Sequence, residues 1–238
     1  MAIYSGVKID TSGLVLSLDA SSSRSYTGTG NTWYDLSGNS NHASKVNSPS
    51  YFTIAGGGFT VDGVGTNYFD LDSKTSLVNL SAGTVGGWVR FADLNTTSNN
   101  NVFVSYGGNA YGGGFLLQSA GLNGSSYRLE FTTWGGSITG APEAALNLAD
   151  SAQYQNQDIY MIGTWTTSEI KLYINGVVRS TVSTNAALPS RSTLRINSEG
   201  GRARGINGHV YNCNIYNRAL SASEIKNNFE ATRDRYGI

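Results

Sequence analysis

The sequence predicts an all-β protein built from two antiparallel sheets, with a single short helix at its C-terminus. Short stretches in which apolar and polar residues alternate recur along the whole chain, and turn-forming residues bound them. The 238 residues include 30 glycines and many serines, threonines and asparagines, which favour turns and strands over helix interiors. About a dozen strands exceed what one open sheet usually holds, so we expect two sheets.

The expected strands cover residues 14–18, 59–61, 68–71, 84–91, 102–106, 114–117, 127–133, 159–164, 170–174, 177–182, 193–196 and 210–216. The clearest hairpin joins 170–174 to 177–182 through Asn175 and Gly176. A two-residue type I′ turn needs a positive φ at both positions, and Asn-Gly meets that need best.

The one expected helix covers residues 221–234. Ser221 and Glu224 form a capping box, and Leu220 can pack against Ile225 as a hydrophobic staple. Ile225 and Phe229 lie four residues apart, which predicts an amphipathic helix resting on a sheet.

Composition excludes several classes of function. Sixteen basic residues balance sixteen acidic ones, and only 13% of residues are charged, so the chain lacks the excess of basic residues that binding to nucleic acid requires. One cysteine and two histidines exclude an internal disulfide and a Cys/His zinc site. The sequence shows no run of about 18 apolar residues and no signal peptide, so we expect a protein made in the cytoplasm without a membrane partner.

Three motifs carry a resemblance to a known family. Residues 84–89, 170–176 and 208–225 resemble the buried-tryptophan strand, the hairpin and the closing motif of laminin-G-like jelly-roll domains, within the concanavalin-A-like lectin/glucanase superfamily. Residues 13–20, 33–39, 47–51 and 228–238 are similar to a branch common among structural proteins of tailed bacteriophages. The resemblance implies one jelly-roll domain over residues 1–238, with residues 1–12 as a candidate docking arm.

Two details of the closing motif make structural predictions. Val210, Cys213 and Ile215 can all face the core only if a bulge interrupts the strand between Val210 and Cys213. Arg218, just before the helix, is expected to pair with a carboxylate or to cap carbonyl groups beneath the turn.

The sequence offers little catalytic chemistry. Glycosidic cleavage needs two carboxylates about 5 to 9 Å apart, and no expected strand carries such a pair. Asp70 and Asp72 are two residues apart, but they lie at a strand end. Cys213 is expected to be an inert core residue, and His209 points to the opposite face of its strand. His42 is expected to be an ordinary loop residue. We therefore expect a protein that is not an enzyme and has no cofactor.

A calcium site is the one metal site worth weighing, because some laminin-G-like domains hold Ca²⁺ through oxygen ligands. Residues 35–39 place Asp35 and Asn39 around a tight turn, for which an Asx turn is the simpler account. Where relatives often carry two acidic residues in the last strand, this chain has Tyr211 and Asn212. We therefore predict no metal.

Three aromatic side chains are candidates for binding a glycan. Tyr106 and Tyr111 flank a glycine-rich loop, and Trp134 shares a strand face with Arg128, Glu130 and Thr132, because Leu129 and Phe131 alternate toward the core. Packing against a neighbouring subunit or against the second sheet is the alternative for each ring, since exposed aromatic residues do not distinguish sugar from protein partners.

The resemblance and the missing catalytic groups together predict a non-enzymatic virion protein of a tailed phage, of the capsid-decoration, head-fibre or tail-fibre type. Such a protein would dock on other virion proteins and on further copies of itself. The alternative is a glycan-binding adhesin module that uses Tyr106, Tyr111 and Trp134. A polysaccharide depolymerase is a third hypothesis, and it would need a carboxylate pair assembled from different strands.

Overall fold

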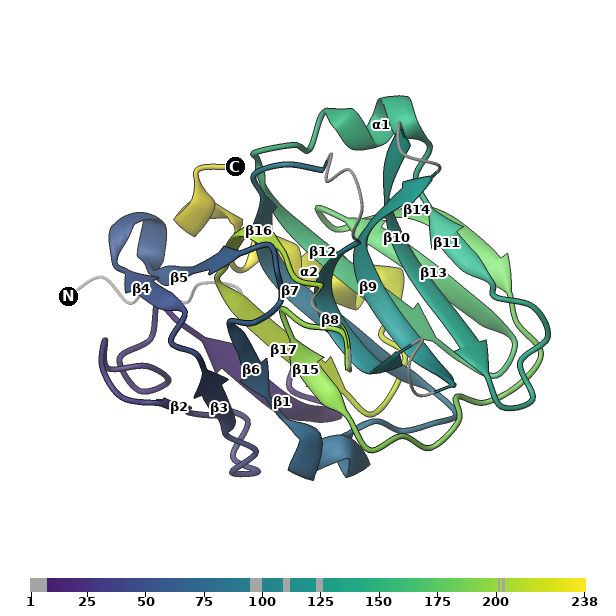
Figure 1. Ribbon diagram of the computed structural model, residues 1–238, viewed down its shortest axis with the longest axis horizontal. Coiled ribbons are helices and arrows are strands. Elements are labelled where there is room, and N and C mark those ends of the chain that lie inside the picture. Colours follow the sequence, from purple (N-terminus) through teal and green to yellow (C-terminus); the bar gives the residue numbers. More distant parts are fainter. Residues whose placement is uncertain (1–7, 95–99, 109–111, 123–125, 201, 203) are drawn as a thin grey trace.

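The computed structural model describes residues 8–94, 100–108, 112–122, 126–200, 202 and 204–238. Over these residues the chain forms two antiparallel sheets, stacked face to face as a sandwich, and a short C-terminal helix (Figure 1). The predicted fold class is therefore confirmed. Most of the predicted docking arm, residues 1–7, lies outside the described residues, and the extent of the domain stays a prediction.

The first sheet has nine strands and includes the predicted hairpin. Its strands are β1 (Leu14–Asp19), β4 (Ser50–Phe52), β5 (Gly58–Asp62), β7 (Gly83–Phe91), β12 (Asp158–Trp165), β13 (Glu169–Ile174), β14 (Val177–Ser183), β16 (Asn207–Val210) and β17 (Asn212–Tyr216). Their order is β14-β13-β12-β7-β16-β5-β4, and β17 pairs with both β7 and β1. Asn175 and Gly176, between β13 and β14, both have positive φ (52° and 77°), which confirms the predicted turn.

The second sheet has eight strands. They are β2 (Thr32–Trp33), β3 (Ala43–Val46), β6 (Tyr68–Asp70), β8 (Asn101–Gly108), β9 (Gly113–Leu122), β10 (Ser126–Gly135), β11 (Glu143–Ala145) and β15 (Leu194–Ile196). Their order is β11-β10-β9-β8-β15-β6-β3-β2. The sequence prediction missed β2, β3, β4 and β11, because strands of two to four residues are too short to show a period.

Helices are few and short in the described part of the chain. The α-helices are α1 (Leu148–Ala152) and α2 (Ala222–Glu230), and the 3-10 helices are η1 (Ile54–Gly56), η2 (Asp72–Leu77) and η4 (Arg233–Tyr236). The capping box of Ser221 and Glu224 is present as predicted. The helix is shorter than the predicted span of 221–234, because it ends at Glu230 and a 3-10 turn follows.

The main hydrophobic core fills the space between the two sheets. Its fully buried aromatic side chains come from both layers: Trp33, Phe59, Phe69, Phe91, Phe103, Tyr106, Phe115, Phe131 and Trp165. The predicted interruption of the last strand is confirmed, since β16 ends at Val210 and β17 starts at Asn212. Val210, Cys213 and Ile215 therefore all reach this core, while Tyr211 packs on the opposite face of the sheet.

A second core lies on the outer face of the nine-stranded sheet, beneath α2 and η4. Trp88 of β7 is stacked on Tyr236 and Phe229, with ring centroids 4.1 and 5.6 Å apart, and its Nε1–H donates to Oγ1 of Thr232 (2.8 Å). Arg218 pairs with both carboxylate oxygens of Glu224, as predicted for a carboxylate partner. In Figure 1 this helix, in yellow, lies on the far side of the molecule from β9 and β10. The outer face of the nine-stranded sheet is thus covered around Trp88.

Candidate functional site

The candidate site lies on the outer face of the eight-stranded sheet, over β9 and β10. Along β10, Leu129 and Phe131 enter the main core, so Arg128, Glu130, Thr132 and Trp134 point the other way. The register places Gln118 of β9 directly opposite Glu130. Outward-facing side chains of the two strands are therefore neighbours on one surface.

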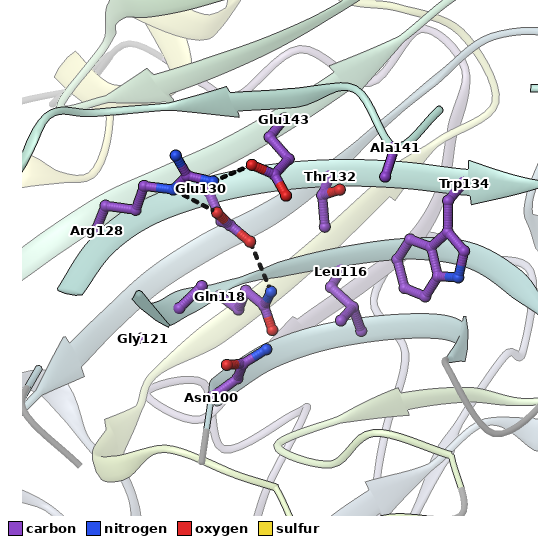
Figure 2. A pocket seen from close by; sticks show the side chains of 11 residues that line it. Asn100, Leu116, Gln118, Gly121, Arg128, Glu130, Thr132, Trp134, Ala141 and Glu143 are labelled. Atoms are coloured by element: carbon purple, nitrogen blue, oxygen red, sulfur yellow. Dashed lines mark hydrogen bonds and ion pairs between the residues drawn. The ribbon is translucent and has the colours of Figure 1, made fainter. Parts of the chain in front are cut away.

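These side chains surround a pocket of about 240 Å³. Its polar end is formed by Arg128, Glu130, Glu143, Gln118 and Asn100, with Ala120 and Gly121 beside them, and its other end by Leu116, Thr132, Ala141 and Trp134. Figure 2 shows the indole of Trp134 at the end of the pocket away from the Arg128 cluster. The pocket is slightly smaller than the roughly 300–1,000 Å³ typical of drug-sized ligands, which suits one or two small rings.

One guanidinium holds two carboxylates at the polar end. Nε of Arg128 donates to Oε2 of Glu130 (2.8 Å), and its Nη2 donates to Oε2 of Glu143. Gln118 completes the cluster, because its Nε2 donates to Oε1 of Glu130 (2.8 Å) (Figure 2). Both oxygens of Glu130 therefore accept a hydrogen bond from a neighbouring side chain.

Glu130 has an unusual environment for a carboxylate, since it is only 3% exposed. Burial raises its pKa above the ordinary value of 4.5, and the hydrogen bond from Gln118 and the charge of Arg128 offset only part of that effect. Glu143 lies at the rim, where 42% of its side chain is exposed. The two carboxylates thus differ in depth and in solvation.

Gln118 contributes an acceptor without a partner. The residue is 2% exposed, and its Oε1 atom is buried with no hydrogen-bond partner within the structure. Buried polar atoms in proteins are almost always paired, with protein, water or ligand. The bond from Nε2 to Glu130 fixes the orientation of this amide and leaves Oε1 as a buried, unpaired acceptor on a residue that lines the pocket.

The three aromatic residues predicted to bind a ligand have different outcomes. Trp134 is half-buried and lines the pocket. Tyr111 lies outside the described residues. The expectation that Tyr106 sits on an exposed loop is wrong: Tyr106 is 1% exposed and packs beside Phe115, and its hydroxyl accepts the backbone N–H of Arg191 (2.9 Å). Val104, two residues earlier in β8, faces the same core, as strand alternation requires.

The convergence of Glu130 and Glu143 was not predicted from the sequence. The two carboxylates come from different strands, β10 and β11. Thr132 lies opposite Glu143, so Glu130 is the next residue on the same face. No local sequence signal could reveal this pair, because it depends on how a three-residue strand aligns with β10.

The other candidate residues have structural partners. Asp72 pairs with Arg195 (2.6 Å), and Asp70 accepts the backbone N–H of Asp72. Burial raises the pKa of the Cys213 thiol to about 12, so the thiol is protonated at neutral pH. His209 contacts Thr60 through its Nδ1 atom (3.3 Å) and lies beside the rings of Phe52 and Tyr211.

The turn weighed as a calcium site is an Asx turn. The carboxylate of Asp35 accepts the backbone N–H groups of Ser17, Ser37 and Asn41 (2.8, 2.9 and 3.0 Å). His42 accepts the backbone N–H of Asp35 (3.0 Å). Among the residues that the structure describes, no group of three or more His, Cys, Asp or Glu side chains could hold a metal ion. The helices described are all too short or too polar to cross a membrane.

Comparisons with solved structures find the same fold in domains of botulinum neurotoxins. The receptor binding domain of botulinum neurotoxin C/D mosaic serotype is 16% identical, with a TM-score of 0.65 over 93% of this chain and 52% of its own. The ligand binding domain of botulinum neurotoxin serotype D, solved with N-acetylneuraminic acid, is 17% identical, with a TM-score of 0.65 over 92% of this chain and 51% of its own. The chain thus spans about half the length of these toxin domains.

A third similar structure matches nearly end to end. Domain 4 of AbnA, an extracellular arabinanase of Geobacillus stearothermophilus, was solved with arabinotriose. It is 14% identical, with a TM-score of 0.65 over 91% of this chain and 98% of the domain. No curated protein sequence matches the chain. The Laminin_G_3 family model, described as concanavalin A-like lectin/glucanases superfamily, matches residues 62–226. Since this match covers more than half of the chain, the protein belongs to the concanavalin A-like lectin/glucanases superfamily.

Proposed function

We propose that this protein is a glycan-binding module whose ligand occupies the pocket between Trp134 and the Arg128 cluster. The observation that carries the proposal is the combination of a half-exposed indole with a buried acceptor, Oε1 of Gln118, that has no partner. A sugar ring offers C–H groups for the indole face and hydroxyl groups for the acceptor. One ligand class thus satisfies both features of the pocket.

The similar structures support this proposal at the level of the fold. One was solved with arabinotriose and another with N-acetylneuraminic acid. Likeness of fold alone does not transfer a ligand, so the weight of the proposal rests on the pocket. The virion assignment stays a prediction, and a glycan-binding role is compatible with display on a particle.

Hydrolysis is the competing function, because Glu130 and Glu143 converge in the same pocket. A glycosidase needs one carboxylic acid with a protonated oxygen directed at the scissile bond. Both oxygens of Glu130 instead accept hydrogen bonds from the protein, and Arg128 holds Glu143 as well. The cluster is therefore arranged to be rigid rather than to transfer a proton, which favours binding without cleavage.

A glycan array followed by calorimetry tests the proposal. Trp134→Ala should weaken the best glycan about 30-fold, which corresponds to the loss of about 2 kcal/mol typical of a central aromatic contact. Tyr34→Ala is the matched control, since Tyr34 is a 44% exposed aromatic residue away from the pocket. The same glycan, incubated with the protein, should release no new reducing ends. Sustained release that Glu130→Gln abolishes would refute the non-enzymatic assignment, and glycan binding unaffected by Trp134→Ala would refute the proposed site.

A further inference from the structure

We propose that the pocket selects uncharged sugars and excludes sugars that carry a carboxylate. This inference rests on the proposed function and names the ligand class of the same site. It sets the chain apart from the similar toxin domain that was solved with N-acetylneuraminic acid, an acidic sugar.

Gln118 holds a buried side-chain oxygen that has no partner in the structure, and a carbonyl oxygen can only accept a hydrogen bond. Its amide nitrogen is already bonded to Oε1 of Glu130. A sugar hydroxyl can donate to this oxygen, whereas an ionised carboxylate has no hydrogen to donate. A ligand carboxylate placed there would leave two acceptors facing each other. A ligand group that reaches Oε1 of Gln118 must therefore supply a hydrogen-bond donor.

The charged side chains of the pocket carry more negative than positive charge. Among the described residues that line the pocket, Arg128 is the one cation, and it faces Glu130 and Glu143. Its Nε and Nη2 groups are both engaged by these carboxylates. The lining thus carries one positive charge against two carboxylates, and an acidic sugar would add a further negative charge close to the exposed carboxylate of Glu143. Like charges at such short range are strongly unfavourable.

The end of the pocket away from Arg128 is apolar. Trp134, Leu116 and Ala141 provide aromatic and aliphatic surface there. This surface suits the C–H face of a neutral ring and offers nothing to compensate a buried charge. Each part of the pocket thus favours an uncharged sugar for a different physical reason.

The test compares each neutral glycan that binds in a Trp134-dependent manner with the same glycan after selective oxidation of its primary hydroxyl groups to carboxylates. We expect the oxidised form to bind at least about tenfold more weakly at low salt. Raising the ionic strength to about 0.5 M should narrow the difference, because salt screens repulsion between exposed charges.

Glu143→Gln tests the cause of the selectivity. It removes the exposed charge and releases Nη2 of Arg128, so it should reduce the preference for the neutral form several-fold. Glu169→Gln is the matched control: the Glu169 side chain is 40% exposed and ion-paired with Lys171 on another sheet, and the preference should stay unchanged.

The outcomes separate this inference from the proposed function. Equal or tighter binding of oxidised glycans, or an array whose Trp134-dependent ligands all carry carboxylates, would overturn the selectivity and leave a glycan-binding module. A preference that Glu143→Gln does not change would overturn the role assigned to charge. The absence of any Trp134-dependent glycan would overturn the proposed function and the selectivity with it.

Discussion

Replacing Arg128 with methionine should destabilise the protein far more than replacing another cation of the same kind. The change leaves the 3% exposed carboxylate of Glu130 with only the hydrogen bond from Gln118. Removing one partner of a fully buried ion pair costs about 3–5 kcal/mol, whereas an exposed pair contributes about 0–1 kcal/mol. The pair of Arg128 with Glu143 is of the exposed kind, because the Glu143 side chain is 42% exposed. We therefore expect Arg128→Met to lower the free energy of unfolding by about 2–3 kcal/mol.

Lys171→Met provides the matched control. Lys171 also pairs with a glutamate on a strand, but Glu169 is 40% exposed, so the loss should stay below about 1 kcal/mol. Urea unfolding followed by tryptophan fluorescence gives both values, and unchanged slopes would show that the unfolded states are comparable.

The pH dependence of the Arg128→Met penalty gives a second, independent check. Burial raises the pKa of Glu130 in the folded state, and the variant loses the cation that lowers it, so that pKa should rise further. A group with a raised folded pKa stabilises the fold when protonated, and this contribution is lost as the pH rises through the raised value. The penalty should therefore be largest near pH 7 and shrink on acidification toward the ordinary value of 4.5. A penalty below about 0.5 kcal/mol at pH 7, or one that grows on acidification, would refute the reasoning.

Two further predictions concern the C-terminal helix and the thiol. The hydrogen bond from Arg218 lowers the pKa of Glu224 to about 2, so its stabilising contribution is complete above the ordinary value of 4.5 and is lost as the pH falls through about 2. Glu224→Gln should thus lower the free energy of unfolding by about 1 kcal/mol at pH 7 and by less in acid. Glu230→Gln, on the same helix, should lower it by less than about 0.5 kcal/mol. Equal losses for the two variants in urea unfolding would contradict this prediction. Cys213 should resist a thiol reagent at pH 8 until urea unfolds the protein, because its folded pKa is about 12, and rapid labelling of the folded protein would show that it is accessible.

Local signals in the sequence predicted those parts of the fold that depend on neighbouring residues. The turn at Asn175 and Gly176 and the capping box at Ser221 each follow from residue types at fixed spacing. The face of β10 that carries Trp134 also followed from alternation, since Leu129 enters the core as predicted. In each case, the residues whose pattern made the prediction lie within about four positions of the turn, cap or strand face that they determine.

The remainder of the site depends on register between distant strands, which no local pattern encodes. Gln118 meets Glu130 across β9 and β10, and Glu143 joins them only through the alignment of β11 with β10. Tyr106 was misplaced for a different reason: β8 continues to Gly108, so this ring lies within the strand and faces the core with Val104. Shifting a strand by one residue would reverse every such assignment, so these features become visible only in the assembled sheet.

The two outer faces of the sandwich differ in a way that supports the proposed ligand site on the eight-stranded sheet. On the nine-stranded sheet, Trp88 is fully buried, because Phe229 and Tyr236 stack on its ring and Thr232 accepts its N–H group. The C-terminal helix thus uses on that face the same kind of surface that a sugar would need. Trp134 lies on the other sheet and stays half-exposed at the edge of a pocket. The C-terminal helix therefore covers the ring of Trp88, whereas the ring of Trp134 on the β9–β10 surface stays accessible to the proposed ligand.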